Sequence, residues 1–362
     1  MKKIFLFPLI IVTLILLCGC NDTVKLEFDT TEKVKAGISN ALSKSYKHVT
    51  IPQNIKINMP ESINIFKPNS SDFILNENDT KLTETIRLLY DPDDFDKTKN
   101  LTDEITVMSI NTDSSDPTYQ FFNDTKDEHC AISKNGYIHL GTDEILNAEV
   151  IECEYTDNVK DNEKYQKAIA VAEGKMNEAV KLQNNLPAKP YLISTIRSQS
   201  GHDYYMIYFC RTIGDVKIIP FGTEDATNFD ISQEGKSSRR WFNSPLYVCV
   251  DQDYNACAIH IFGISNAEKA EVVEKIPTLD YVLNYISKEL APNLNIEIRN
   301  ISFMYGTDSV DKKIYPVWYI EFSNRKAQSP DAADHNRLII NASNGLITTF
   351  IEKTCEERDG TG

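Results

Sequence analysis

The residues that could do chemistry in this chain are few and widely spaced. None of its six histidines lies four positions from another, which is the spacing of two metal ligands on one helix face. His129 and Cys130 form the one neighbouring His/Cys pair, but adjacent residues of a strand point to opposite faces. We therefore predict neither a metal site nor a thiol–imidazole couple at these positions.

Acidic clusters supply the next candidates. Residues 251–255 follow the pattern Asp-x-Asp-x-Asn, with which a calcium loop begins. Ala256 stands where such a loop needs glycine, and Phe262 stands where it needs a bidentate glutamate. We interpret the segment as a polar hairpin turn, and the acidic residues 91–96 as a solvated loop that could hold a cation only loosely. No metal and no cofactor are predicted.

The chain lacks the signatures of common catalytic and nucleotide-binding sites, namely GxSxG, HExxH, the P-loop and GxGxxG. Its 53 acidic residues still allow a dispersed pair of carboxylates of the glycosidase kind. The favoured interpretation is a non-catalytic binding or regulatory module. The alternative is a cell-surface hydrolase with dispersed carboxylate residues. A solute-binding protein with two α/β lobes fits less well, because strand–helix–strand alternation is missing.

One aromatic segment offers candidates for ligand contact. Tyr315, Trp318 and Tyr319 lie in a predicted strand and could line a groove. Alternating aromatic residues of a strand also pack into a core on one face, so both interpretations stay open. These three are the predicted binding residues.

The first twenty residues have the pattern of an export signal. Two lysines precede an apolar run of about fourteen residues, shorter than the roughly 20 that span a bilayer, and the run leads to Gly19-Cys20. The segment resembles the lipobox of bacterial lipoproteins, in which the cysteine after the cut is acylated. The resemblance implies diacyl chains (palmitate) on Cys20 and a lipid-anchored protein on the extracellular side of the cell membrane. An ordinary cleaved signal peptide and an uncleaved anchor are the alternatives.

Composition predicts a folded, acidic body. Hydrophobic content of 41% and aromatic content of 10% are sufficient for globular cores, and 362 residues exceed what one small core organises. The formal net charge of −15 repels nucleic acid and anionic headgroups. The expected partners are therefore the membrane, through the N-terminal lipid, and a protein or peptide, but not nucleic acid.

Cysteines beyond the lipobox permit disulfides in an oxidising exterior. They are Cys130, Cys153, Cys210, Cys249, Cys257 and Cys355. The local sequence favours a disulfide only between Cys249 and Cys257, because these two residues flank the turn of a predicted hairpin. A disulfide between these two and a pair of buried free thiols are equally compatible with the sequence.

Two segments repeat the order of a helix followed by antiparallel strands. Residues 161–183 have apolar side chains at helical spacing and precede several predicted strands. Thr278 caps a second helix at 279–290, after which strands also follow. No helix separates consecutive strands. We therefore predict the α+β class, built from repeated units of a helix packed on an antiparallel sheet.

The last of these units carries a family resemblance. Its segment 315–322 is a proline-aromatic strand, and after a polar loop the segment 338–345 ends in Asn-Ala-Ser-Asn-Gly. Both features are similar to PepSY-like modules and to extracytoplasmic regulators of the YycH/YycI type, although Ser-Asn-Gly replaces their Thr-Gly-like turn. The whole chain also resembles an uncharacterised Gram-positive lipoprotein family. The resemblance implies a PepSY-like fold here and a binding or regulatory role without catalytic residues.

These observations predict a linear domain organisation. It comprises a lipoprotein signal peptide (1–20), an N-terminal extended segment (21–70), a first α+β region (71–155), a second α+β unit (156–275), a C-terminal PepSY-like unit (276–354) and a tail (355–362).

Overall fold

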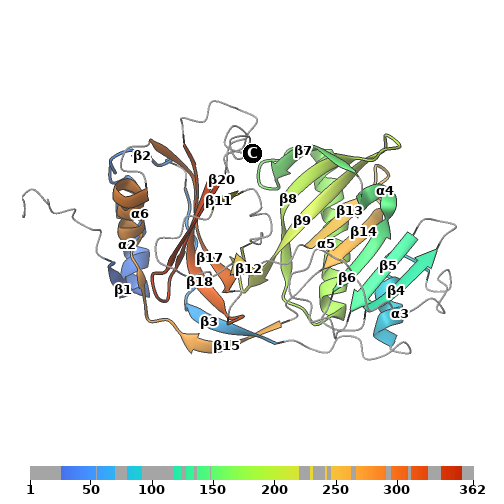
Figure 1. Ribbon diagram of the computed structural model, residues 1–362, viewed down its shortest axis with the longest axis horizontal. Coiled ribbons are helices and arrows are strands. Elements are labelled where there is room, and N and C mark those ends of the chain that lie inside the picture. Colours follow the sequence, from blue (N-terminus) through green and yellow to red (C-terminus); the bar gives the residue numbers. More distant parts are fainter. Residues whose placement is uncertain are drawn as a thin grey trace, which may run out of the picture.

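The computed structural model of the chain describes residues 26–53, 55–69, 80–91, 118–123, 128–133, 137–146, 148–219, 229–230, 241–242, 246–261, 266–290, 295–308, 311–324 and 336–352. These residues form two large, mostly antiparallel sheets with helices packed on them (Figure 1). The predicted α+β class is confirmed. The predicted lipobox with Cys20, most of the acidic cluster 91–96 and the tail with Cys355 lie outside the described residues.

The first sheet lies on the right in Figure 1. Its described strands have the order β4-β5-β6-β14-β13-β9-β8-β7, with β10 beside β9, and all its pairs are antiparallel. They are β4 (Thr118–Asn123), β5 (Glu128–Ser133), β6 (Ile138–Thr142), β7 (Glu149–Tyr155), β8 (Ala188–Arg197), β9 (Asp203–Ile213), β10 (Val216–Lys217), β13 (Leu246–Val250) and β14 (Ala256–Ile261). Helix α5 (Glu163–Leu182) packs on β8, β9, β13 and β14. Helix α3 (Thr80–Ile86) contacts α5, and the short α4 (Asp143–Leu146) follows β6.

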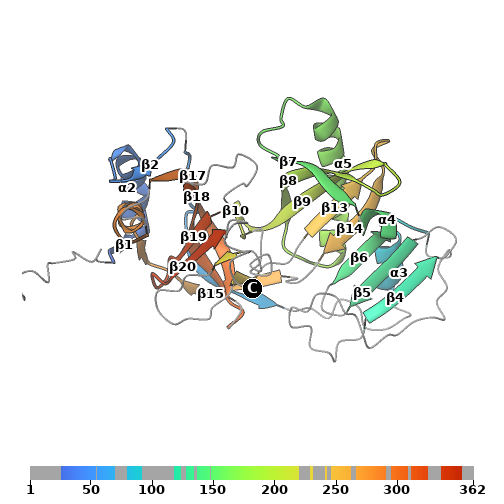
Figure 2. The ribbon, with the colours of Figure 1, turned by 45° about the horizontal axis from the view of Figure 1, so that its top comes forward.

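The second sheet has the described order β11-β20-β19-β18-β17-β12, and β2, β3 and β15 attach to it. Its strands are β2 (Val49–Thr50), β3 (Asn64–Asn69), β11 (Phe229–Asp230), β12 (Trp241–Phe242), β15 (Asn266–Val272), β17 (Ile296–Asp308), β18 (Ile314–Asn324), β19 (Asn336–Asn341) and β20 (Ile347–Glu352). A small separate sheet joins β1 (Phe28–Thr30) to β16 (Lys275–Pro277). Helices α2 (Thr31–Ser43) and α6 (Leu279–Tyr285), the latter continued by a π-helical turn over Ile286–Leu290, lie beside each other next to this sheet (Figures 1 and 2).

The first sheet is an insertion within the unit that carries the second sheet. Strands β3 and β15 pair with each other, from Asn64 opposite Val272 to Asn69 opposite Asn266, although the whole first sheet lies between them in the chain. The structure therefore groups the segments differently from the predicted linear division. The described strands β2 and β3 of 21–70 pair with strands of the second sheet, and the described strands of 71–155 share one sheet with most strands of 156–275. The grouping depends on the pairing of strands that are far apart in the chain, such as β3 and β15. The local periodicity of the sequence does not predict which distant strands pair.

Helix α5 confirms the helix predicted at 161–183. The Asn162 side chain accepts a hydrogen bond from the backbone N–H of Tyr165 at 3.3 Å and so caps the first turn. The predicted apolar stripe is buried against the first sheet, together with the small residues between its members: Tyr165, Ala168, Ile169, Ala172, Met176, Ala179 and Val180. Burial of this stripe, more than intrinsic propensity, holds the helix on the sheet.

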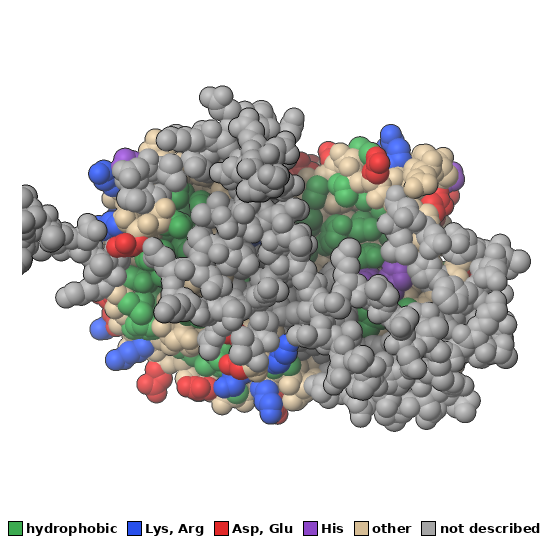
Figure 3. All heavy atoms as spheres, in the orientation of Figure 1, with side chains coloured by type: hydrophobic (Ala, Val, Ile, Leu, Met, Phe, Trp, Pro, Cys, Tyr) green, Lys and Arg blue, Asp and Glu red, His purple; other side chains and the backbone are tan. Residues whose placement is uncertain are grey.

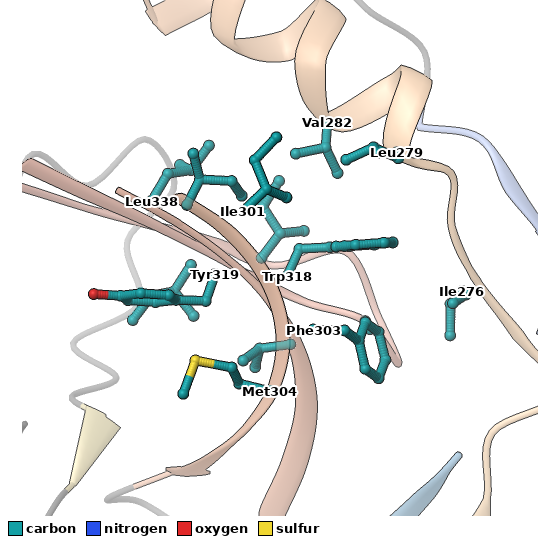
Figure 4. Close-up of a cluster of buried hydrophobic side chains, with 14 of the residues drawn as sticks. Ile276, Leu279, Val282, Ile301, Phe303, Met304, Trp318, Tyr319 and Leu338 are labelled. Carbon is teal, nitrogen blue, oxygen red and sulfur yellow. The ribbon is translucent and has the colours of Figure 1, made fainter. Parts of the chain in front are cut away.

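Helix α6 starts at the predicted cap, because Thr278 Oγ1 accepts the N–H of Tyr281 at 3.1 Å. Figure 4 shows Trp318 of β18 lying between the sheet and this helix, close to Leu279 and Val282. Its indole Nε1–H donates to the Pro277 carbonyl at 2.9 Å. The Phe303 ring meets the indole edge-on, with centroids 5.2 Å apart. Trp318 therefore anchors β16 and α6 to the second sheet.

The described part of the chain contains no helix that is both long and apolar enough to cross a membrane.

Replacing Trp318 by phenylalanine tests the role of this anchor. The change leaves the Pro277 carbonyl without its buried donor and creates a small void, so we expect a loss of about 1–3 kcal/mol in the free energy of unfolding. Urea denaturation followed by circular dichroism measures it. Val272→Ala is the control, because Val272 is 52% exposed and should cost much less. Equal denaturation midpoints for Trp318→Phe and the wild type would contradict the assignment.

Candidate functional site

One cross-strand row of the first sheet gathers most of its described ring side chains. The pairing register places its members next to one another on consecutive strands, in the order Tyr155 (β7), Leu192 (β8), Tyr208 (β9), Tyr247 (β13), His260 (β14) and His139 (β6). Directly opposed residues of antiparallel strands present their side chains on the same face. We call these six residues the ring row.

The ring row lies on the face of the first sheet that α5 does not cover. Side chains alternate between the two faces of a strand. Ile207, Val248 and Ile259 directly adjoin members of the row in sequence, and all three are buried in the core beneath α5. Figure 3 shows hydrophobic side chains, with histidine among them, on this side of the first sheet. Tyr208, Tyr247 and His260 are of intermediate exposure and His139 is buried, so only part of the ring surface of the row faces outward.

The two histidines of the row are in direct contact. His139 Nδ1 and His260 Nδ1 lie 3.1 Å apart, a distance at which one neutral imidazole donates its N–H to the other. Tyr247 stacks on His260 with centroids 4.9 Å apart and an interplanar angle of 7°, and Tyr137 meets the same ring edge-on at 5.5 Å. Burial among these rings lowers the pKa of His260 to about 4. The His260 ring is therefore neutral at pH 7 and lies within hydrogen-bond distance of His139.

The side chains of the ring row are suited to contact an apolar or aromatic group of a ligand. Ring faces and edges attract other rings and aliphatic chains, while tyrosine hydroxyls and imidazole nitrogens offer hydrogen bonds at their tips. Two histidine nitrogens alone are too few ligands for a protein zinc site. Within the described residues, no group of three histidine, cysteine, aspartate or glutamate side chains is placed to hold a metal ion.

A second polar cluster contains serine, histidine and glutamate, the residue types of a catalytic triad. Ser200 Oγ donates to Glu144, and His202 Nδ1 lies 3.1 Å from Ser200 Oγ and 3.2 Å from Glu144 Oε1. A triad needs the nucleophile on one ring nitrogen and the acid on the other. Here both partners meet the same nitrogen, and the His202 side chain is 71% exposed. The cluster instead fixes the turn between β8 and β9, where Gly201 has a φ of +89°.

Four carboxyl groups of the described residues have pKa values shifted away from that of an acid catalyst. Hydrogen bonds from Ser200 and Ser198 lower the pKa of Glu144 to about 2. Asp29, Asp203 and Asp280 also have lowered pKa values, chiefly through hydrogen bonds from neighbouring groups, which outweigh the raising effect of their burial. A glycosidase-type general acid needs a raised pKa instead. None of these four described carboxyl groups meets that need.

The segment 251–255 is a turn stabilised by its first residue. Asp251 Oδ1 accepts the backbone N–H groups of Asp253 and Asn255 at 2.9 and 2.8 Å. These bonds form the Asx-type turn that joins β13 to β14. The prediction of a polar hairpin turn is confirmed.

The three aromatic residues predicted to bind a ligand do not form an exposed groove. Trp318 is completely buried, and Tyr315 and Tyr319 are 8% and 3% exposed. Trp318 belongs to the core under α6, while the tyrosine hydroxyls donate to Asp311 and Glu321. The prediction is corrected in favour of the core interpretation: β18 is a central strand, paired on both sides, so its rings are enclosed.

Cys249 and Cys257 occupy the predicted hairpin, and both are free thiols in the structure. The register places Cys249 opposite Ala258, and a bulge shifts Cys257 out of direct opposition. The Cys257 thiol donates to the carbonyl oxygen of Cys249 at 3.4 Å. The predicted hairpin is confirmed. Of the two alternatives for its cysteines, a disulfide or free thiols, the structure has free thiols.

A pH titration of stability tests the environment of His260. The unfolded imidazole gains its proton near pH 6.5, whereas the folded ring resists protonation until about pH 4. The unfolded state therefore binds more protons between these values, and stability falls as the pH falls. From pH 7 to pH 5 we expect His260 to cost about 2 kcal/mol in the free energy of unfolding.

His260→Gln should remove most of this pH dependence in urea denaturation at the two pH values. His202→Gln is the matched control, because that histidine is exposed at a turn and the variant should keep the wild-type dependence. An unchanged dependence in His260→Gln would show that the ring is not held neutral by burial.

Comparison with known proteins adds no relative. No protein-family model matches the chain, and neither a curated protein nor a solved structure matches it. The candidate site is therefore defined by the geometry of this chain alone.

Proposed function

We propose that this chain is a lipid-anchored extracytoplasmic protein that binds a protein or peptide partner without transforming it. The observation that carries the proposal is the ring row, in which aromatic and imidazole rings and Leu192 lie side by side on a sheet face that α5 leaves uncovered. Aromatic side chains of this kind supply large contact area at low cost in conformational entropy, and they are enriched at interfaces.

The lipobox resemblance supports the membrane location. Gly19-Cys20 follows a short apolar run with two lysines before it. Two acyl chains on Cys20 would give lasting attachment, since one chain binds membranes only weakly. The acidic body would then lie on the extracellular side of the membrane.

Topology supports a proposed internal repeat of a helix followed by an antiparallel sheet, the feature for which we also propose a PepSY-like relation. Helix α6 precedes the antiparallel meander β17-β18-β19-β20, and helix α5 precedes strands that lie in the order β8-β9-β13-β14. The aromatic segments 204–209 and 315–322 occupy the second strand in each case. We propose that the two units are distant repeats of one helix-and-sheet module, with residues 214–245 inserted in the first.

The lipid anchor is tested with Cys20→Ser. Removing the acylated sulfur should release the protein from membranes into the medium, and metabolic palmitate labelling should fall to background. Cys153→Ser, at an exposed cysteine of β7, is the control and should stay attached. Full membrane retention of Cys20→Ser would contradict the lipobox.

The ring row is tested with a neutral apolar dye, Nile red, as the probe. Tyr208→Ser removes a ring from the middle of the row, and we expect the dye to bind about tenfold more weakly, as for an aromatic hot spot. Tyr205→Ser is the matched control, because Tyr205 lies three residues earlier on β9 and faces α5, where it contacts Tyr165. Equal dye binding by both variants would contradict the assignment of this face.

A further inference from the structure

Strand β7 forms one edge of the first sheet, and among the described residues it pairs only with β8 (Figures 1 and 2). The N–H of Thr156 donates to the Tyr191 carbonyl at 3.1 Å, so the backbone of Thr156 points toward β8. Backbone groups alternate in direction along a strand. The N–H and C=O groups of Cys153 and Tyr155 therefore point away from the sheet, where they can pair with another strand.

This edge also exposes apolar side chains. Five large hydrophobic residues are exposed in the described part of the chain, and three of them lie on β7: Val150 at 60%, Ile151 at 53% and Tyr155 at 45%. Lysine and proline, which commonly protect edge strands, are absent from β7. A bulge at Ile151 interrupts the start of the strand and leaves Glu152–Tyr155 as a regular edge.

The two faces of this edge differ in chemistry. Glu152 Oε2 accepts the hydroxyl of Tyr165 on α5 at 2.7 Å, so Glu152 and its alternate neighbour Glu154 lie on the α5 face. Cys153 and Tyr155 lie on the opposite face, where Tyr155 is the terminal member of the ring row. The edge is thus acidic on one face and apolar on the other.

We propose that β7 is the docking edge for an extended, basic segment of a partner protein, which adds to the first sheet as a further strand. Alternate apolar side chains of that segment would continue the ring row beyond Tyr155. Its lysine or arginine side chains would lie beside Glu152 and Glu154 on the other face. Main-chain hydrogen bonds supply affinity in this mode of recognition, and the alternate side chains supply specificity. The inference rests on the proposed binding function and names the partner's chemistry.

Charge argues against a second copy of this chain as the occupant. Two β7 edges paired with each other would place glutamates of one copy beside glutamates of the other. Like charges on neighbouring strands are destabilising. A basic strand instead meets opposite charge at the same positions.

Fluorescence anisotropy of a labelled Val-Lys-Val-Lys-Val-Lys peptide with full-length protein in detergent micelles tests the proposal. We expect saturable binding of this peptide and about tenfold weaker binding of Val-Glu-Val-Glu-Val-Glu, because the charges then repel. A backbone N-methylated form of the basic peptide cannot complete the strand ladder and should also bind about tenfold more weakly.

Two variants locate the site on the protein. Glu154→Lys reverses a charge on the edge and should weaken the basic peptide about tenfold. Cys153→Pro removes an outward N–H without touching the bonds to β8, and should weaken it similarly. Glu268→Lys makes the same charge change on β15, an edge strand of the second sheet, and should bind like the wild type.

Several outcomes would overturn the proposal. They are failure of the basic peptide to bind, equal binding of the N-methylated or acidic peptide, and wild-type affinity in both β7 variants. Sedimentation could instead show that the protein forms a dimer. If Glu154→Lys changes this dimerisation and the basic peptide does not bind, the edge is assigned to a second copy of the chain. Tyr208-dependent dye binding without peptide binding would overturn the β7 proposal alone. Absence of both the Tyr208-dependent dye binding and the peptide binding would also remove support for the ring row as a binding surface.

Discussion

The pairing of β3 with β15 determines how the rest of this chain is arranged. It closes the unit of the second sheet around a long insertion, and the loop-closure entropy of such a long segment must be offset by packing. The inserted residues therefore need their own core, which α5 and α3 complete on one face of the first sheet. On the other face the short α4 packs Ile145 against Cys249 and Ala258, and α5 leaves the ring row uncovered.

The insertion also contacts the unit of the second sheet, through a backbone hydrogen bond and a shared buried cluster. The N–H of Ile219 donates to the carbonyl of Tyr305 at 2.8 Å, just after β10 leaves β9. Val216, Ile218, Tyr305 and Ile314 share a small buried cluster at this point. Near the C-terminal end of β7, the charges of Glu321 and Arg337 in the second sheet act on the pKa of Tyr155, which burial raises. The edge of the first sheet thus lies within reach of charges on the second.

Local features of the fold could be predicted from the sequence, and long-range features could not. Caps and helical spacing at Asn162 and Thr278 are local signals, and both helices were predicted. The ring row combines residues from six strands between positions 139 and 260, so no window of sequence contains it. Alternating Tyr and His in predicted strands was the available signal, but only strand order brings these rings together. The same limit explains the error at Trp318, since a central and an edge strand can have the same periodicity.

We propose that the face and edge of the first sheet form the contact surface. Hydrogen exchange of the full-length protein, read by mass spectrometry with and without the Val-Lys peptide, tests this proposal. We expect slower exchange in peptides that cover 149–156 and unchanged exchange in 266–272, the edge strand of the second sheet. Protection confined to the second sheet, or no protection in either segment, would rule out the proposed surface.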